Sequence, residues 1–325
     1  MKKIKFLILP LLTISLCSCD VSTELNKKSF YFDTYVNTRL FEGTEDNLND
    51  INKIFKKIDK LTDNYKARDI VNVYTLNNSG NGTKIEVDPY LYDLYVKCSF
   101  KREENPDVTS LKYFSVMMGS LSKKWKQSLS KGKVLDEETI NEELEKKNHT
   151  YIATYSEPNF VSKSGDAELD YGAVAKGFAL DKVKSYLDSK NITKYLVDCG
   201  SSSILLGEKE GGKNFNIEIS NLPNSYLSLK NCVISTSSMS RQMVVIDGKK
   251  YSHIINPKTG SAINKNDAAI VISKDGYLGD ILSTDFVNEE VDDIKELEKK
   301  FSVKTLIIRN NKVIYKSKNL EVLKG

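Results

Sequence analysis

The sequence predicts an α+β fold, built as a single domain with mixed or antiparallel sheets and flanking helices. Segments with helical spacing of apolar residues dominate the first half of the chain, and short strand-like runs dominate the second half. Asp247-Gly248 separates two such runs, which is the sequence signature of a tight antiparallel hairpin. No linker-like composition interrupts residues 31–325, so this part of the 325-residue chain is expected to form one domain.

The first 18 residues have the pattern of a signal peptide. A basic start precedes a short apolar run, Phe6–Leu16, which is too short to span a membrane permanently. The following Leu16-Cys17-Ser18-Cys19 looks like a bacterial lipobox, with cleavage before Cys19 and lipidation of its thiol by groups such as palmitate. A plain secretory signal with an incidental cysteine is the alternative. Residues 19–30 are then the lipidated cysteine and a polar tether, and the expected location is the extracytoplasmic face of the cell membrane.

Charge and cysteine content exclude some functions. The formal net charge of +4 includes three lysines of the signal, so the remaining chain is about +1, which argues against nucleic acid as a partner. The acidic runs at 136–138 and 289–293 are expected on solvated helix faces. Cys98, Cys199 and Cys232 are an odd set without a CxxC pair, so we expect buried thiols, with one disulfide as the alternative.

Hydrophobic periodicity locates the elements from Tyr31 onward. For example, Ile51, Phe55, Ile58 and Leu61 recur at helical spacing. Helices are expected at 45–61, 91–100, 116–129, 136–147, 177–189, 277–287 and 290–301. Strands are expected at 31–40, 195–199, 203–206, 215–219, 242–246, 268–272, 305–308 and 312–315.

The helix predicted at 277–287 carries a carboxylate and a hydroxyl on one face. Asp280 and Thr284 are four residues apart, so their side chains project in the same direction. Both are hard oxygen ligands, and Mg²⁺ usually takes one or two such ligands together with waters and a substrate phosphate. A solvated helix edge with a local hydrogen bond is the alternative for this pair.

Two further stretches contain groups that suit phosphate chemistry. In Glu168-Leu-Asp170-Tyr-Gly-Ala-Val-Ala-Lys176-Gly-Phe, small residues and a lysine lie at the start of a predicted helix, where free N–H groups attract phosphate. The alternative makes Asp170 a turn or cap residue and Lys176 a surface lysine. His253 follows a predicted strand and precedes an Asn-Pro turn, a place where catalytic groups are often found, although a structural role is the alternative.

Four motifs in order give the chain its resemblance to a known family. Asp170-Tyr-Gly-Ala-Val-Ala-Lys176-Gly resembles the D-L-G-x-I-A-K-G stretch of the ApbE family, the FAD:protein FMN transferases. Thr236-Ser237 is similar to its T-S pair, Ser252–Gly260 to S-H-I-I-D-P-x-T-G, and Gly279–Thr284 to A-D-A-L-A-T. The resemblance extends over about residues 31–310 and includes Phe32-Asp33-Thr34, Tyr65 and Tyr113-Phe114-Ser115.

The resemblance implies a set of site residues. Family members bind FAD and Mg²⁺, cleave the pyrophosphate, release AMP and move FMN to a Thr or Ser hydroxyl of another protein. By position, the carbonyl of Ala173 with Asp280 and Thr284 would ligate the metal, and His253 would lie near the reacting phosphate, with His253 or Asp280 as catalytic base. Residues implied to contact FAD are Phe32, Tyr65 (stacked on the adenine), Tyr113, Phe114, Ser115, Asp170, Lys176 and His253.

Three functions remain open at this level. The first is FMN transfer to a separate exported flavoprotein, since the chain has no Asp-x-x-[Ser/Thr]-[Gly/Ala/Ser]-Ala-Thr segment of its own to act as acceptor. The second is FAD hydrolysis to FMN and AMP at the same site, and the third is non-catalytic flavin binding by a lipoprotein. The chain departs from the family pattern at Ser115-Val-Met, Ser201, Ser238-Met-Ser and Asn256, so the pocket walls are expected to differ.

Overall fold

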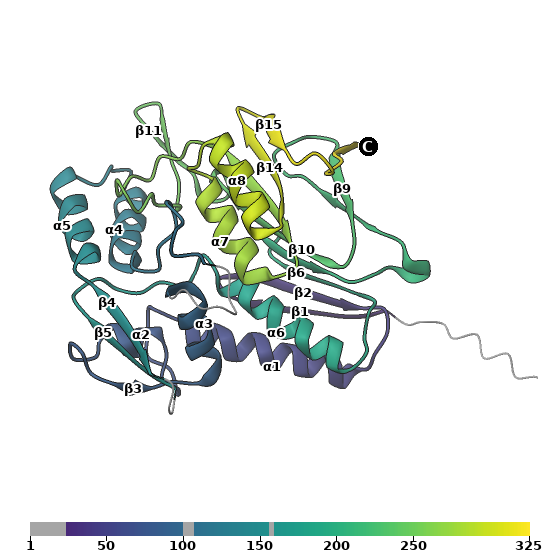
Figure 1. The fold of residues 1–325 in the computed structure, drawn as a ribbon, viewed down its shortest axis with the longest axis horizontal. Helices are drawn as coiled ribbons and strands as arrows, with labels where there is room; N and C mark the ends of the chain where they lie inside the picture. The colour runs from purple at the N-terminus through teal and green to yellow at the C-terminus, as the bar shows by residue number, and fades with distance from the viewer. Residues whose placement is uncertain (1–23, 100–106, 156–158) are drawn as a thin grey trace, which may run out of the picture.

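A computed structural model of the protein describes residues 24–99, 107–155 and 159–325 (Figure 1). An eight-stranded sheet, in the order β1-β2-β6-β7-β10-β13-β14-β15, runs through the centre, and every neighbouring pair in it is antiparallel. Its strands are β1 (Leu25–Tyr31), β2 (Thr34–Leu40), β6 (Tyr195–Cys199), β7 (Ser203–Leu206), β10 (Cys232–Ser238), β13 (Ala268–Ser273), β14 (Lys304–Arg309) and β15 (Lys312–Lys316). The predicted α+β class is confirmed.

Helices cover one face of this sheet (Figure 1). They include α1 (Glu45–Thr62), α6 (Ala175–Ser189), α7 (Gly276–Phe286) and α8 (Val291–Phe301). Their apolar faces join sheet residues such as Val197, Val233 and Val271 in one buried core. Helix α1 shows how sequence dictates this arrangement, because its buried Leu48, Ile51, Phe55, Ile58 and Leu61 form one stripe and Thr44 caps its N-terminus.

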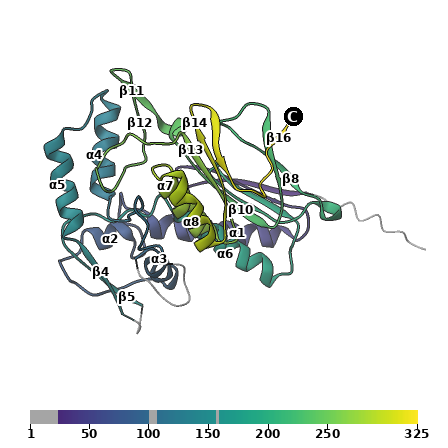
Figure 2. The same cartoon turned by 45° about the horizontal axis from the view of Figure 1, so that its top comes forward.

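A small sheet covers the opposite face. It has the order β16-β9-β8 and comprises β8 (Phe215–Glu218), β9 (Ser225–Leu229) and β16 (Leu323–Lys324) (Figure 2). Phe215 and Leu227 of this sheet pack with Ile204, Ile234 and Ile270 of the large sheet in a second core. The central strands of the large sheet are therefore buried on both faces, and their consecutive residues point alternately to the two cores.

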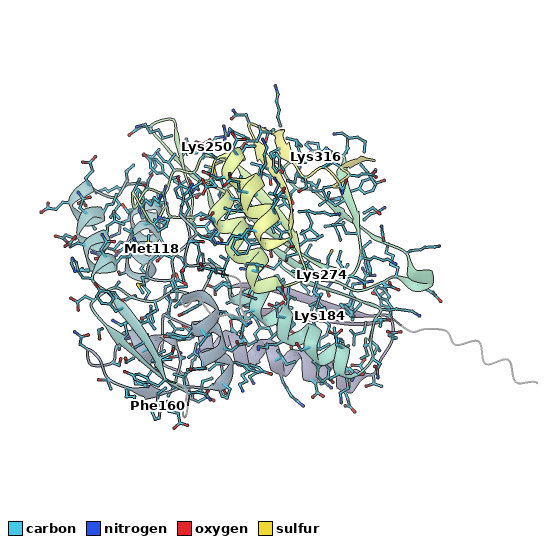
Figure 3. The ribbon with its side chains drawn as sticks, viewed as in Figure 1. Met118, Phe160, Lys184, Lys250, Lys274 and Lys316 are labelled. Carbon is cyan, nitrogen blue, oxygen red and sulfur yellow. The ribbon has the colours of Figure 1, made fainter. Side chains whose placement is uncertain are left out.

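A smaller group of elements lies at one end of the large sheet (Figure 1). It comprises α2 (Val73–Asn77), β3 (Ile85–Glu86), α3 (Pro89–Ser99), α4 (Gly119–Ser130), α5 (Glu137–Asn148), β4 (Tyr151–Tyr155) and β5 (Phe160–Ser164). Trp125 of α4 stacks on Tyr251 of β12, with ring centres 5.8 Å apart, and so joins this group to the hairpin of β11 (Val244–Ile246) and β12 (Lys249–Tyr251). Lys250, on this projecting hairpin, is labelled in Figure 3.

Several sequence predictions are confirmed and some are wrong. The hairpin turn has φ of 49° at Asp247 and 74° at Gly248, as a two-residue turn of this type requires. The single strand predicted at 31–40 is instead a hairpin, because Phe32 and Asp33 both have positive φ and turn β1 back onto β2. Residues 25–30, predicted as tether, belong to β1.

The remaining differences concern short elements and the N-terminus. Strand β10 escaped prediction because its Ser- and Thr-rich sequence lacks a strong apolar signal. The three cysteines within the described residues are free thiols; Cys98 and Cys199 are buried, as predicted, and Cys232 is partly buried. Cys19 and the signal peptide lie outside the described residues. None of the helices that the structure describes is long and apolar enough for a bilayer crossing.

Candidate active site

The candidate site is built where α6 and α7 cross with their backbones in contact. A Cβ on Gly177 of α6 would lie 2.1 Å from the carbonyl oxygen of Gly276, and a Cβ on Gly276 would lie 2.4 Å from that of Gly177. Only glycine fits at both positions, so these two residues set the separation of the helices. The start of α6, with the predicted phosphate stretch, is thereby held against the face of α7 that carries Asp280.

The carboxylate of Asp280 is buried and is held by three hydrogen bonds. Its Oδ1 accepts from the hydroxyls of Ser203 (2.8 Å) and Ser235 (2.7 Å), and its Oδ2 accepts from the N–H of Gly177 (2.7 Å). Burial raises the pKa of Asp280, while nearby Lys176 and these three donors act against that rise. Since a carboxylate offers about four acceptor positions, one position on Oδ2 remains for a further ligand.

Ala173 and Thr284 carry the two other oxygens of the predicted metal set, one just before α6 and one on α7. In a continuous helix the N–H of Gly177 would donate to the carbonyl of Ala173. That N–H donates to Asp280 instead, so the Ala173 carbonyl does not have it as the partner that a continuous helix would supply. The hydroxyl of Thr284 donates to the main-chain carbonyl of Asp280 (2.9 Å) and lies 3.3 Å from the Ser237 hydroxyl. A carbonyl, a carboxylate and a hydroxyl form a hard oxygen set that fits Mg²⁺.

A second contact between the two helices fixes the start of α7. The carboxylate of Asp181, in α6, accepts from the N–H groups of Gly276 (2.5 Å) and Tyr277 (2.9 Å). It therefore supplies an N-terminal cap to α7 from a neighbouring helix. Burial raises the pKa of Asp181 to about 7 despite these two bonds. No role for Asp181 is predictable from the sequence, because the two N–H groups that it accepts from lie 95 and 96 residues away.

Asp170 and Tyr65 lie on either side of a lysine of α4. Oδ1 of Asp170 accepts from the N–H of Gly172 (2.7 Å), so this residue does form a turn, as its alternative role predicted. Burial raises the pKa of Asp170, and Lys123 acts against the rise. The ammonium of the same Lys123 lies 5.0 Å from the ring centre of Tyr65, whose exposed fraction of 53% leaves one surface open for stacking.

Phe32 lies in the turn between β1 and β2. Its N–H donates to the carboxylate of Asp59 in α1 (2.7 Å), and its ring meets the edge of Phe55 with centres 6.4 Å apart. A φ of 53° is unusual for a bulky residue, so the turn is held by these tertiary contacts. These contacts tie Phe32 to α1, and α6 lies between α1 and α7 (Figure 1).

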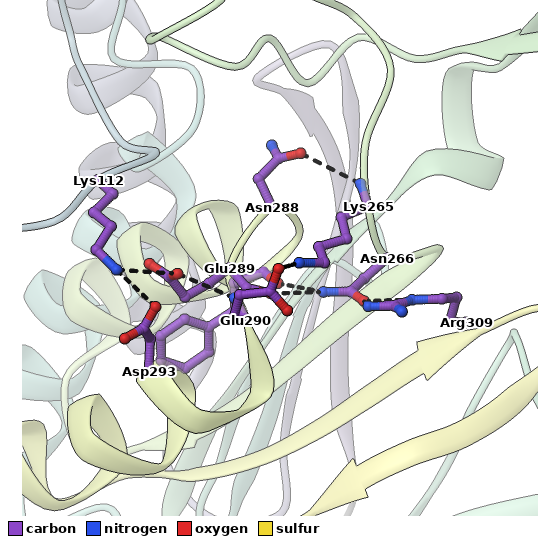
Figure 4. Close-up of polar contacts among 9 residues, drawn as sticks. Lys112, Lys265, Asn266, Asn288, Glu289, Glu290, Asp293 and Arg309 are labelled. Carbon is purple, nitrogen blue, oxygen red and sulfur yellow. Dashed lines mark hydrogen bonds and ion pairs between the residues drawn. The ribbon is translucent and has the colours of Figure 1, made fainter.

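The segment Tyr113-Phe114-Ser115 is tied to the end of α7. The N–H of Tyr113 donates to Oδ1 of Asp285 (2.6 Å), the residue directly after Thr284. Lys112 reaches Glu289 (3.4 Å) and Asp293 (2.7 Å) beside it (Figure 4). The pKa of Asp285 is raised to about 7, chiefly by burial. The prediction that the 289–293 run is entirely solvated is wrong at Glu289, which is buried because it faces the 112–115 segment.

His253 lies in the loop between β12 and β13, with an exposed side chain between buried Ser252 and Ile254. Oδ1 of Asn256 accepts from the N–H of Lys258 (2.9 Å), so asparagine keeps the turn that an aspartate would form there. The ammonium of Lys258 lies 5.1 Å from the ring centre of Tyr113. The loop thus meets the 113–115 segment, which in turn is bound to α7.

The structure gathers some of the predicted residues more closely than others. Lys176 and Asp280 lie together at the helix crossing, and Thr284 lies one turn beyond Asp280 on α7. Ala173 lies four residues before Gly177, just ahead of α6, and Tyr65 and Tyr113 lie on other elements. Within the described part of the chain, no group of three or more His, Cys, Asp or Glu side chains could hold a metal, and the predicted set contains only one such side chain. Sequence reasoning missed Ser203 and Ser235, since serines in unpredicted or short strands give no signal of their own.

The chain is similar to known proteins in both sequence and structure. The family model described as the ApbE family matches residues 32–307. An FAD:protein FMN transferase of Klebsiella pneumoniae is 32% identical over 126 residues, covering 38% of this chain and 40% of the relative. One of Treponema pallidum is 26% identical over 213 residues, covering 59% of this chain and 58% of the relative. The chain thus spans about two fifths to three fifths of the curated relatives it matches.

Solved structures share the fold. The ApbE protein of Thermotoga maritima superposes with a TM-score of 0.72 at 21% identity, covering 93% of this chain and 97% of that one. The flavin transferase ApbE of Vibrio cholerae gives a TM-score of 0.73 at 21% identity, covering 91% and 97%.

Proposed function

The chain belongs to the ApbE family, and on that premise we propose that it transfers FMN from FAD to a Thr or Ser hydroxyl of an exported target protein, releasing AMP. The observation that supports the proposal most directly is the buried Asp280 carboxylate at the α6–α7 crossing, with Thr284 one turn further along α7 and Ala173 four residues before Gly177. FAD is the proposed donor and Mg²⁺ the proposed metal. When bound by these three oxygens, Mg²⁺ would neutralise charge that develops on the pyrophosphate.

The other residues have roles that follow from their positions. Lys176, beside Asp280, would hold a phosphate oxygen of FAD by charge. Tyr65 would stack on the adenine, with Asp170 and the 113–115 segment around it and Phe32 as a further contact. Ser203 and Ser235 would orient the Asp280 carboxylate, as groups behind a metal ligand commonly do.

The transfer step requires a base for the acceptor hydroxyl. The hydroxyl oxygen attacks the phosphorus of the FMN half, the bond to the AMP oxygen breaks, and AMP leaves with the electron pair. Three hydrogen bonds and a metal leave the Asp280 carboxylate without an acceptor position for the hydroxyl proton. This favours His253 over Asp280 as the base that takes the proton.

The proposed location follows from the N-terminal sequence alone. Lipidation of Cys19 would anchor the protein at the extracytoplasmic face of the cell membrane, where exported acceptors are found. Mass spectrometry of the membrane fraction, compared with a Cys19→Ser variant, tests this. An unmodified, soluble parent chain would contradict it.

The function is tested with residues 20–325, FAD and Mg²⁺. AMP release is followed by chromatography, and an acceptor domain carrying a threonine is examined by mass for bound FMN. An adduct that needs Mg²⁺ and the threonine supports transfer; AMP and free FMN without an adduct indicate a pyrophosphatase; tight FAD binding without either product indicates a binding protein.

One variant pair tests the metal site in the same assay. Asp280→Ala removes the only carboxylate of the proposed metal set, so we expect loss of Mg²⁺-dependent turnover. Asp292→Ala removes a carboxylate on the surface of α8, with a side chain 93% exposed, and serves as the control that retains turnover. Mg²⁺-dependent turnover in Asp280→Ala would exclude this metal site.

A further inference from the structure

A cavity of about 320 Å³ lies on the face of β10 opposite to the candidate site. The side chains of β10 alternate between the two places. Ser235 and Ser237 reach Asp280 and Thr284, whereas Thr236 and Ser238 line the cavity. The proposed FMN transfer uses only the face of β10 that carries Ser235 and Ser237. It does not use the cavity on the other face.

The free edge of β8 forms one wall of this cavity. Six consecutive residues, 216–221, line it, although alternation would expose only every second side chain of a strand to one face. The backbone edge therefore borders the cavity, and β8 is the last strand of its small sheet (Figure 2). Because the N–H of Ile219 donates to Ser225, the peptide groups of Asn216 and Glu218 point away from β9.

The remaining walls define the chemistry of a ligand. Ile204, Ile234 and Ile270 form an apolar floor. Asp198 supplies a carboxylate from β6, whereas Glu218 borders the cavity with its backbone because its side chain points to the exposed face of β8. None of the described residues that line the cavity is Lys or Arg. Such walls repel a pyrophosphate and attract a cation, so the cavity is unsuited to the phosphates of FAD. An edge strand with unpaired peptide groups beside an apolar floor is suited to an extended peptide.

We propose that this groove docks an extended segment of the acceptor protein as an added strand along β8. An apolar side chain of the segment lies on the isoleucine floor, and a basic side chain lies beside Asp198. This inference rests on the proposed function for the identity of the partner. Ser238 lines the groove, and the preceding residue, Ser237, contacts Thr284 on the other face of β10. A segment bound in the groove can therefore pass the end of β10 and place its acceptor hydroxyl at the candidate site.

The test uses the full chain in detergent and a displayed library of random 12-residue peptides. Enriched peptides are expected to combine alternating apolar residues with a basic residue. Their binding is expected to be at least tenfold weaker to Glu218→Pro, which removes an N–H that faces the groove while leaving the bonds to β9 in place. Glu218→Gln keeps that N–H and changes only a side chain on the exposed face of β8, so it is the matched control and should bind like the parent chain. Hydrogen exchange at Asn216 and Glu218 is expected to slow when a peptide binds.

Two outcomes overturn the docking proposal. One is the absence of enriched peptides, and the other is equal binding to the parent chain and Glu218→Pro. Ser220→Trp fills the groove from an exposed position and gives the same test should the proline variant unfold. Two measurements separate the docking proposal from the proposed function. FAD hydrolysis in the absence of acceptor should be unchanged in Glu218→Pro, because that variant alters only the groove. Peptide binding without any FMN transfer would support docking and contradict the proposed function.

Discussion

The two ends of the candidate FAD site are built in different ways. At the α6–α7 crossing, backbone meets backbone at Gly177 and Gly276, and the Asp280 carboxylate is buried among matched donors. At the proposed adenine end, Tyr65 is 53% exposed and has two lysines, Lys123 and Lys126, near its ring at 5.0 and 5.3 Å. One end is part of the core and the other is assembled on the surface.

Because of this difference, changes at the crossing should affect folding stability, whereas changes at the adenine end should affect only the affinity for FAD. A change at the crossing disturbs the packing of two helices and the position of every oxygen they carry, so stability and turnover should fall together. A change at the adenine end would alter contacts that form only when FAD binds to exposed side chains. The KM for FAD should therefore change while the fold is retained.

Gly177→Ala should have the largest effect. The added Cβ would lie 2.1 Å from the Gly276 carbonyl oxygen and 2.8 Å from Cγ of Asp280, so the helices must separate. We expect a loss of about 3 kcal/mol in unfolding free energy and more than 100-fold in turnover, since overpacking and displaced ligands combine. Chemical denaturation and AMP release measure the two effects. Ala179→Gly, in the same helix, should cost about 1 kcal/mol but keep turnover, because it adds no atom at the crossing. Normal turnover in Gly177→Ala would show that the crossing does not set the site.

Asp181 should make the crossing sensitive to pH. Its pKa in the folded chain is about 7, above the unfolded value near 3.9, so the folded state binds the proton more tightly. Stability should therefore fall as pH rises from about 4 to 7 and level off above 7, with an upper bound on the order of 4 kcal/mol for this group.

Thermal unfolding of the parent chain and Asp181→Asn between pH 4 and 8 measures this. The asparagine side chain cannot titrate, so the variant should lack the part of the slope that Asp181 contributes, while the background from Asp285, whose pKa is also about 7, remains in both. Identical slopes would mean that Asp181 stays ionised in the folded chain.

Asp285 connects the two ends and should show an intermediate effect. Removing its carboxylate in Asp285→Ala leaves the N–H of Tyr113 without its acceptor, so the 113–115 segment should shift. We expect KM for FAD to rise about tenfold with a small change in kcat. Asp285→Asn keeps the Oδ1 acceptor and should stay within about threefold of the parent. Steady-state AMP release measures both, and a loss confined to kcat would instead place the effect at the metal end.

The sequence predicted local structure correctly where a residue pattern is compatible with only one conformation. Asp247-Gly248 predicted its hairpin because both positions need positive φ, and the stripe in α1 predicted a buried helix face. Asp280 and Thr284 were predicted on one helix face, and the family resemblance led to Ala173. Ser203, Ser235 and Asp181 were not predicted, because their partners lie 77, 45 and 95 or 96 residues away and no local pattern records such a contact. Phe32 was predicted within a strand but lies in a turn, because phenylalanine gives no indication of a positive φ.

Tyr65 should show the smallest effect, and it isolates the adenine end. Aromatic stacking on a base contributes about 1–3 kcal/mol, and an exposed ring that already attracts Lys123 and Lys126 should fall at the low end of that range. Tyr65→Leu should therefore raise KM for FAD about fivefold, with kcat and unfolding free energy unchanged. Tyr65→Phe keeps the ring and should match the parent, because stacking on a base uses the face of the ring and not its hydroxyl. Equal KM for all three chains would mean that adenine does not stack there, and a fall in kcat with Tyr65→Leu would show that the surface end also sets the reacting geometry. That second result would contradict the division between the two ends, since it would make the position of the pyrophosphate depend on a contact outside the core.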